Sequence, residues 1–169
     1  MTMLFTTIDS PLGELLLAGE RVASAPGGTA LASLSVPGQK GGASVGAGWV
    51  RDDAAFAAVA EQLGAYFAGE LTRFDIAYVP SGSEFRRRVW AALDAIPYGT
   101  TLTYGAVADA IGAPRSAARS VGTAIGANPL LVVRPCHRVI GANGSLTGYA
   151  GGLERKQMLL ALEGMTLGV

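Results

Sequence analysis

Residues 128–141 read NPLLVVRPCHRVIG and contain the only cysteine and the only histidine of this 169-residue chain. A single cysteine cannot form a disulfide within the chain, and one cysteine with one histidine is too few ligands for a structural zinc site. Cysteine reacts as the thiolate, and a neighbouring histidine or arginine lowers the pKa of its thiol. The segment Pro135-Cys136-His137-Arg138 supplies both neighbours. We therefore expect a nucleophile at Cys136, with an inert buried cysteine as the alternative.

The residues on either side of this segment predict its local structure. The apolar run at 130–133 predicts a short buried strand that leads into Cys136. Adjacent side chains on a strand point to opposite faces, so His137 need not touch Cys136 and can act through a bridging water. Downstream, Asn143-Gly144 predicts a turn, and a last helix from Leu153 ends at Glu163. Glu163 is a candidate carboxylate partner of His137, and an exposed helix-end glutamate is the alternative.

Upstream, two short helices are predicted around a turn that contains glycine. Thr103 can cap a helix that runs to residue 111, and residues 112–115 interrupt it. Ser116 can cap a second helix, which Asn128-Pro129 stops. This pattern is typical of a helix-turn-helix, although other helical hairpins share it.

The second of these helices has a face without bulky side chains. Ala118, Gly122 and Gly126 recur at every fourth position, beside Arg119. Glycine costs about 1 kcal/mol relative to alanine inside a helix, so two glycines require a reason. Close approach of another backbone is one reason, and packing on a neighbouring helix is the alternative.

The rest of the chain predicts two domains, at 1–82 and 83–169. The first begins with a hairpin at 4–17 and continues with a loop at 24–48 that has room for one edge strand. Asp52 and Asp53 can cap a helix that Gly69 stops, and a strand is expected at 71–79. The second domain opens with a helix that Ser83 can cap.

Charge is distributed unevenly between these halves. Residues 1–83 hold four Lys/Arg and eight Asp/Glu, whereas residues 84–169 hold nine and five. Arg86, Arg87 and Arg88 lie near a predicted helix start, where they oppose the helix dipole. The second half can thus face a polyanion such as DNA, with a merely solvated basic face as the alternative. The chain has no signal-peptide pattern and no run of about 18 apolar residues, so we expect a soluble, cytoplasmic protein with no membrane contact.

Residues 84–164 resemble the active-site domain of the methylated-DNA–protein-cysteine methyltransferases, also called O6-alkylguanine-DNA alkyltransferases. The matching stretches are IPYG at 96–99, AARSVG at 117–122, NP at 128–129, PCHRVIG at 135–141 and LTGYAGGLERK at 146–156. The first half matches loosely, through its hairpin, its helix and YFAGE at 66–70. The resemblance implies an α+β fold, with a small α/β domain similar to ribonuclease H followed by a mainly helical domain.

This resemblance implies DNA repair by direct reversal. Cys136 would accept the alkyl group of O6-alkylguanine, and less well of O4-alkylthymine, in duplex DNA. His137 would activate Cys136 through water, with Glu163 behind it and Asn128 organising the turn. The product is a thioether that the site cannot reverse, so the protein would be a single-turnover suicide enzyme. It would need no cofactor and no metal, and we expect a monomer.

The resemblance also implies how DNA is bound. The helix-turn-helix would enter the minor groove, where Arg119 fills the stack left by the flipped base. Tyr104 would lie near the rotated phosphate and protonate guanine N3. The other expected DNA contacts are Ala118, Gly122, Ser116 and Arg115, and the expected base pocket consists of Tyr149, Val139 and Ala150.

The chain departs from the family pattern at three points. Arg134 stands where an aliphatic residue usually precedes Pro-Cys-His-Arg, and we expect its guanidinium to reach solvent, a carboxylate or DNA. The connection at 112–119 is one residue longer than the pattern. The first half lacks the ligands with which some relatives bind zinc.

Three other classes of protein fit the sequence less well. Alkyltransferase-like binding proteins flip lesions but lack the acceptor cysteine, which this chain has. Cysteine hydrolases usually have a histidine base that is remote in sequence. A transcription factor that used only the helix-turn-helix would leave the downstream motifs unexplained.

Overall fold

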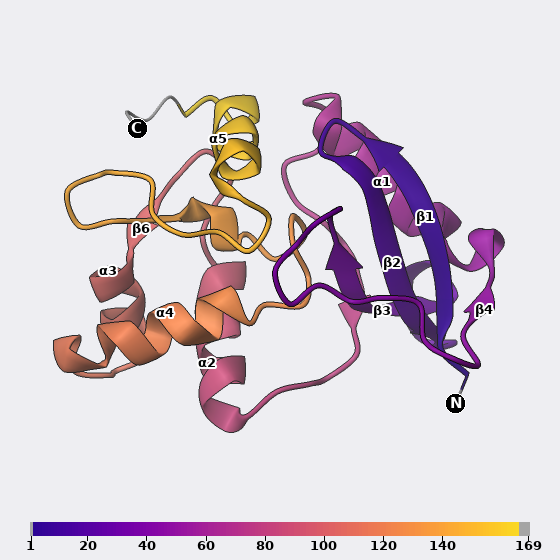
Figure 1. The fold of residues 1–169 in the computed structure, drawn as a ribbon, viewed down its shortest axis with the longest axis horizontal. Coiled ribbons are helices and arrows are strands. Elements are labelled where there is room, and N and C mark those ends of the chain that lie inside the picture. The colour runs from indigo at the N-terminus through magenta and orange to yellow at the C-terminus, as the bar shows by residue number, and fades with distance from the viewer. Residues whose placement is uncertain (1, 166–169) are drawn as a thin grey trace. The chain divides into compact units, whose positions relative to one another are not determined.

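The computed structural model describes residues 2–165 and divides the chain into two compact units, Met1–Pro80 and Ser81–Val169. The predicted boundary, after residue 82, lies two residues beyond this division. Strands dominate the first unit and helices the second. The predicted α+β fold class is confirmed (Figure 1).

The first unit is built on a five-stranded sheet with the strand order β4-β1-β2-β3-β5. The predicted hairpin is present: β1 and β2 are antiparallel, and the pair closes at Ser10 and Gly13. The edge strands β4 and β5 each pair in parallel with their neighbours, β1 and β3. The strand bounds are β1 (Leu4–Ser10), β2 (Gly13–Arg21), β3 (Thr29–Ser35), β4 (Val50–Arg51) and β5 (Ala77–Tyr78).

The region predicted as a loop at 24–48 contains the strand β3, which lies inside the sheet. A short 3-10 helix, η1 (Pro26–Gly28), precedes it. The prediction allowed for one strand here but placed it at an edge, which is wrong, because β3 lies between β2 and β5. The pairing of β3 with β2 is close. A Cβ atom on Gly19 of β2 would lie 2.4 Å from the carbonyl oxygen of Ala30. The strand expected at 71–79 is also shorter, since only β5 forms there.

The predicted helix of the first unit is present and is capped as expected. Asp52 accepts a hydrogen bond from the Ala55 amide at 3.1 Å, at the start of η2 (Asp53–Phe56), and α1 (Ala57–Phe67) follows. The α1 helix runs along one face of the sheet (Figure 1). Its apolar side is buried there and includes Val59, Leu63 and Tyr66.

The second unit consists mainly of four helices, α2 (Glu84–Asp94), α3 (Tyr104–Ala110), α4 (Ala118–Gly126) and α5 (Leu153–Leu162). Two short strands, β6 (Leu102–Thr103) and β7 (Val139–Ile140), pair in parallel. Ser83 and Thr103 cap α2 and α3 through their side-chain oxygens, as the sequence predicted. Trp90 of α2 donates a 2.8 Å hydrogen bond to the carbonyl oxygen of Ala124, which ties α2 to α4.

Ser116 does not cap the second helix of the predicted pair. It lies inside a 3-10 turn, η3 (Arg115–Ala117), and the N-cap position of α4 is Ala117, which makes no side-chain capping bond. The turn begins two residues earlier than expected, with Pro114 at the N-cap position, because Pro114 has the fixed backbone angle that suits such a start, and its oxygen accepts from the Ala117 amide at 2.8 Å.

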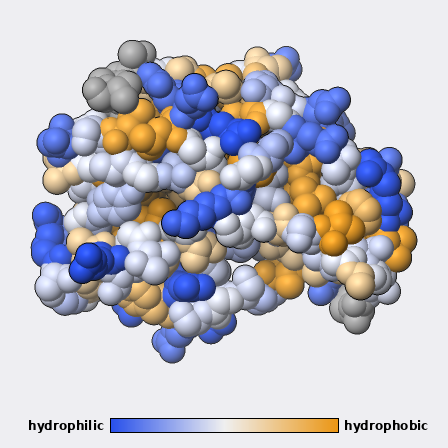
Figure 2. Space-filling view, viewed as in Figure 1, coloured by the Kyte–Doolittle hydropathy of each residue, from blue (hydrophilic) through white to orange (hydrophobic). Residues whose placement is uncertain are grey.

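The surface shows no continuous apolar face in the orientation of Figure 2, where orange patches are separated by hydrophilic side chains. Large apolar side chains that are well exposed within residues 2–165 are Val45, Val50, Leu153 and Met158. The helices in this part of the chain are all too short or too polar to cross a membrane. Arg86, Arg87 and Arg88 are exposed on α2, and Arg88 donates a hydrogen bond to the Ile111 carbonyl at the end of α3.

Candidate active site

The segment before the cysteine is a buried turn organised by the side chain of Asn128. The Asn128 Oδ1 atom accepts from the Leu130 amide at 3.0 Å, and its Nδ2 atom donates to the carbonyl oxygens of Leu130 and Arg134, both at 3.3 Å. The Arg134 amide closes the turn on the Leu130 oxygen at 3.0 Å. The apolar residues 130–133 are buried as expected, but the predicted strand is wrong. Val132 has a backbone φ of 71°, which a strand does not allow.

Cys136, His137 and Arg138 form a single turn of 3-10 helix, η4 (Cys136–Arg138). The extended conformation expected for these residues is therefore wrong as well. All three side chains are buried, with 4%, 0% and 6% of their residue surface exposed. The turn thus buries a thiol, an imidazole and a guanidinium on three consecutive residues.

Burial raises the pKa of the Cys136 thiol to about 11. A hydrogen bond from the Asn128 side chain and the positive charges of Lys156 and Arg134 lower it, but desolvation is the largest influence. The expectation that neighbouring basic groups hold a lowered thiol pKa is thus wrong for the protein without DNA. The thiol carries its proton at neutral pH, so its reaction as a nucleophile requires a group that takes this proton.

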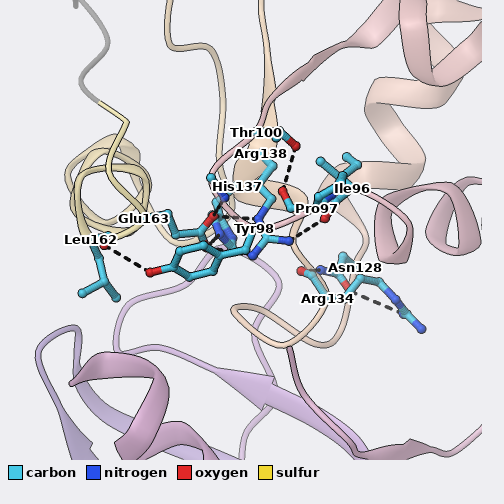
Figure 3. Close-up of polar contacts among 11 residues, drawn as sticks. Ile96, Pro97, Tyr98, Thr100, Asn128, Arg134, His137, Arg138, Leu162 and Glu163 are labelled. Carbon is cyan, nitrogen blue, oxygen red and sulfur yellow. Dashed lines mark hydrogen bonds and ion pairs between the residues drawn. The ribbon is translucent and has the colours of Figure 1, made fainter. Parts of the chain in front are cut away.

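Glu163 is the carboxylate around which the site is built (Figure 3). Its side chain is fully buried, and its Oε2 atom lies 2.8 Å from His137 Nε2. Arg138 donates to both carboxylate oxygens, from Nε at 2.7 Å and from Nη2 at 3.0 Å. The backbone amide of Gly99 donates to Oε1 at 3.2 Å. The expected contact between Glu163 and His137 is therefore present, and the exposed helix-end glutamate is excluded.

This arrangement fixes the proton on the His137 ring. Burial lowers the pKa of His137 and outweighs the opposite effect of Glu163, so the imidazole is neutral. A carboxylate can only accept a hydrogen bond, so the neutral ring places its proton on Nε2 and leaves the Nδ1 lone pair as an acceptor. No residue in the described part of the chain hydrogen-bonds to Nδ1. His137 is thus prepared to accept a proton at Nδ1.

Lys156 connects β7 with the loop that follows it. This lysine of α5 is only 1% exposed, and its Nζ atom donates to the carbonyl oxygens of Val139 at 2.6 Å, Thr147 at 2.7 Å and Gly148 at 3.4 Å. Burial lowers the pKa of Lys156 to about 8. Three carbonyl acceptors match the three protons of an ammonium group, so this contact fixes the loop that precedes Tyr149.

Residues 84–165 match the family described as 6-O-methylguanine DNA methyltransferase, DNA binding domain. The chain is 56% identical, over 94% of its own length and 91% of the relative, to the methylated-DNA–protein-cysteine methyltransferase of Mycolicibacterium paratuberculosis. The chain belongs to the methylated-DNA–protein-cysteine methyltransferase family. The protein of that name from Methanosarcina acetivorans is 46% identical, with coverages of 96% and 99%. The crystal structure of Mycobacterium tuberculosis OGT in complex with DNA has 49% identity, a TM-score of 0.85 and coverages of 95% and 93%.

In this member of the methyltransferase family, the predicted DNA-contact residues of η3 and α4 differ in exposure. Arg119 is exposed, as are Arg115 and Ser116, whereas Ala118 and Gly122 are partly buried. Arg115 makes a bidentate ion pair with Asp109 of α3 at 3.3 and 2.8 Å.

Tyr104 connects the helical surface with the loop that holds the predicted pocket residues. The hydroxyl groups of Tyr104 and Thr147 are 3.2 Å apart and hydrogen-bonded. A Cβ atom on Gly151 would lie 2.8 Å from the Tyr149 ring, so glycine is required for the ring to take this place. Of the other predicted pocket residues, Val139 is fully buried on β7, and Ala150 is partly exposed.

The sequence did not indicate what Arg138 and Lys156 contact in the site. Arg138 was expected only as a neighbour that lowers the thiol pKa of Cys136, and Lys156, although it lies within a matching stretch, was given no role. The available signal for Lys156 was its place in α5, three residues before the apolar Leu159 and thus on the inward face. For Arg138 no local signal indicated that its guanidinium turns inward to Glu163.

Proposed function

We propose that this protein repairs alkylated DNA by direct reversal. It transfers the alkyl group of O6-alkylguanine, and less well of O4-alkylthymine, from duplex DNA to Cys136 after the damaged nucleotide has flipped. The observation that carries this proposal is the buried arrangement of Cys136 beside a neutral histidine that a carboxylate orients. The DNA complex of the related Mycobacterium tuberculosis protein supports DNA as the partner.

The transfer is a displacement at the alkyl carbon. The Cys136 sulfur forms a bond to this carbon as the bond between carbon and guanine O6 breaks. The thiol proton passes through a bridging water to Nδ1 of His137, and Glu163 stabilises the imidazolium that results. Tyr104 donates its hydroxyl proton to guanine N3 as the base leaves, and solvent restores it. Guanine and a thioether are the products.

The raised thiol pKa makes this proton transfer part of the reaction. Because Cys136 holds its proton in the free protein, the thiolate forms only when His137 takes this proton. A permanent thiolate in this buried site would be costly, and it would react with other electrophiles. Asn128 and Lys156 stabilise the negative charge that develops on sulfur.

The α3 and α4 helices supply the DNA-binding surface of the proposal, as a helix-turn-helix. Arg119 takes the place of the flipped base, and the small residues Ala118 and Gly122 let α4 approach the minor groove closely. Arg115 and Ser116 contact the backbone. Tyr149, Val139 and Ala150 line the pocket that receives the base.

In this proposal, the protein acts as a monomer in the cytoplasm and needs no cofactor. Cys136, His137, Arg138, Asn128 and Glu163 all come from the second unit of one chain, so one copy supplies every group that the transfer uses. The thioether is not reversed, so each molecule reacts once.

Intact-protein mass spectrometry tests the proposal. After incubation with excess duplex DNA that contains one O6-methylguanine, the protein should gain one methyl group on Cys136 and no more. The Cys136→Ser variant and an unmodified duplex are the controls, and both should give the unmodified mass. Absence of an adduct, or continued consumption of lesions by modified protein, would contradict the proposal.

A further inference from the structure

Arg134, the residue in which this chain departs from its family pattern, is buried beside the active-site turn. Its guanidinium carbon lies 5.0 Å from the centre of the Trp90 ring, and its Nε atom is 3.4 Å from Asp94 Oδ1. Only 8% of its surface is exposed. An aromatic face and a carboxylate together compensate a buried guanidinium. The prediction that Arg134 reaches a carboxylate is thus confirmed, and Asp94 is that carboxylate.

The guanidinium is one of two donors to the side-chain oxygen of Asn128. Arg134 Nη1 donates to Asn128 Oδ1 at 3.5 Å, and the Leu130 amide donates to the same oxygen at 3.0 Å. Only the oxygen of an amide side chain can accept, so two donors exclude the flipped amide. Nδ2 therefore faces the carbonyl oxygens of Leu130 and Arg134 (Figure 3 shows Asn128 and Arg134). The Cys136 amide donates to the same Arg134 oxygen at 2.7 Å, so the Asn128 amide lies beside Cys136, where its hydrogen bond lowers the pKa of the thiol.

The Trp90 ring, on which the Arg134 guanidinium lies, is held in place from two sides. Trp90 lies on α2 and donates a hydrogen bond to the Ala124 oxygen of α4. The backbone of Gly82 packs so closely that a Cβ atom there would lie 2.7 Å from the Trp90 ring. A cation that is fixed in this way can polarise the Asn128 amide and strengthen its N–H donors.

We propose that Arg134 is a positioning residue for the alkyl transfer, because it holds the Asn128 amide toward the Cys136 sulfur and supplies positive charge beside it. The positive charge of Arg134 lowers the pKa of the thiol, and the negative charge of Asp94 partly neutralises the guanidinium and so weakens this effect. Arg134 and Asp94 both act on the thiol in the protein without DNA. The inference rests on the proposed function for its role in repair, but its effect on thiol reactivity can be measured without DNA.

Arg134→Leu and Asp94→Asn both break the ion pair between these two residues, so a comparison of the two variants distinguishes an effect of Arg134 on the thiol from a purely structural effect. Arg134→Leu removes the cation and the contact to Asn128, so Cys136 should react with iodoacetamide about threefold to tenfold more slowly at pH 8, with its pH profile displaced upward. Asp94→Asn removes the opposing charge and leaves the contact to Asn128, so the reaction should be as fast as in the unmodified protein or faster. Lys156, the other cation that lowers the pKa of the thiol, is unchanged in both variants, as is His137.

The same experiment can overturn the inference. Equal slowing in both variants would show that loss of the ion pair loosens the site, and an unchanged rate in Arg134→Leu would show that Arg134 has no influence. If Arg134→Leu does not fold, Arg134→Lys decides: its single ammonium cannot hold Asp94 and Asn128 together, so its rate should lie below that of Asp94→Asn. Methyl transfer from damaged duplex DNA to the protein without substitutions is measured in parallel. Its absence would refute the proposed function, whereas the iodoacetamide rates of the variants would still test the role of Arg134.

Discussion

The neighbours of Cys136 act on its thiol pKa in opposite directions. Desolvation raises this pKa, whereas the Asn128 hydrogen bond and the cations Lys156 and Arg134 lower it. The sum is a thiol that keeps its proton, with a pKa of about 11. The cluster of basic groups is thus better understood as support for charge that develops during the reaction than as a source of permanent thiolate.

We predict that Cys136 of the folded protein is alkylated by iodoacetamide about a hundredfold more slowly at pH 8 than in the denatured protein, since two pKa units separate about 9 from about 11. The difference should shrink as the pH rises from 9 to 11, because the folded thiol then also ionises. Rates measured by mass spectrometry from pH 7 to 11 test this. A difference that does not change with pH would indicate restricted access alone and would contradict the prediction.

The same thiol affects stability in a direction that can be derived. Its folded pKa is raised, so above pH 9 the unfolded chain releases a proton that the folded chain keeps. The contribution of Cys136 to the free energy of unfolding is therefore complete below pH 9 and is lost as the pH rises toward 11. The Cys136→Ser variant lacks this dependence and is the matched control for denaturation curves.

Among the helices and strands, α4 carries the clearest mark of an external requirement. A Cβ atom on Gly126 would meet no atom within 4 Å, and one on Gly122 would lie 3.8 Å from the Tyr104 ring, an ordinary contact. Packing within the second unit therefore explains neither glycine. The alternative that the small residues serve a neighbouring helix is not supported, and close approach to DNA remains the proposed reason.

We predict opposite effects of Gly122→Ala and Gly126→Ala on stability and on repair. Each should raise the free energy of unfolding by up to about 1 kcal/mol, since alanine favours the helix. Each should also slow methyl transfer from a duplex, on the order of tenfold, because the added methyl group separates α4 from the groove. The rate with free O6-benzylguanine should be unchanged.

Gly64 provides the control for this pair of substitutions. It lies inside α1 of the first unit, and a Cβ atom there also meets open space. Gly64→Ala should therefore give the same gain in stability with no effect on duplex repair. Unchanged duplex rates in both α4 variants would contradict the proposed groove contact.

For helices and strands, the sequence predicted those elements that depend on a few neighbouring residues. The caps of η2, α2 and α3 were predicted from Asp52, Ser83 and Thr103, because a cap depends on a few neighbouring residues. The turn at 130–133 was mistaken for a strand because its backbone is satisfied by the Asn128 side chain, which an apolar pattern does not reveal. The strand β3 depends on long-range pairing with β2 and β5, which was equally invisible.

The candidate site could be predicted in part for the same reason. The contact between Glu163 and His137 was expected from the resemblance and from the helix end. The inward turn of Arg138 and the burial of Lys156 depend on residues outside their own elements, namely Ile96 for the first and Val139 for the second. The thiol pKa was predicted in the wrong direction. A sequence shows which charged residues are neighbours, but it does not show that burial excludes water from the thiol.

For the whole molecule, the reaction is expected to lower stability. Cys136 is 4% exposed, so an added methyl group must fit into a packed interior. Overpacking of this kind costs about 1–3 kcal/mol. For a chain of this length, each kcal/mol corresponds to roughly 2–4 °C in Tm.

We therefore predict that the methylated protein unfolds about 2–12 °C below the unreacted protein. Differential scanning calorimetry of protein that has been separated from the repaired duplex tests this. Protein incubated with an unmodified duplex should keep its original Tm, as should Cys136→Ser after exposure to the lesion. An equal or higher Tm after methylation would contradict the prediction.

The place of Glu163 has a consequence for the newly made chain. Glu163 is 26 residues beyond His137, so the ribosome adds the carboxylate after the imidazole and guanidinium that it holds. At about 5–20 residues per second, this delay lasts on the order of one to five seconds. During translation, Cys136 is therefore already present while its proton acceptor still lacks its orienting partner. Folding of α5 onto the site is the step that turns a nascent thiol into a repair reagent.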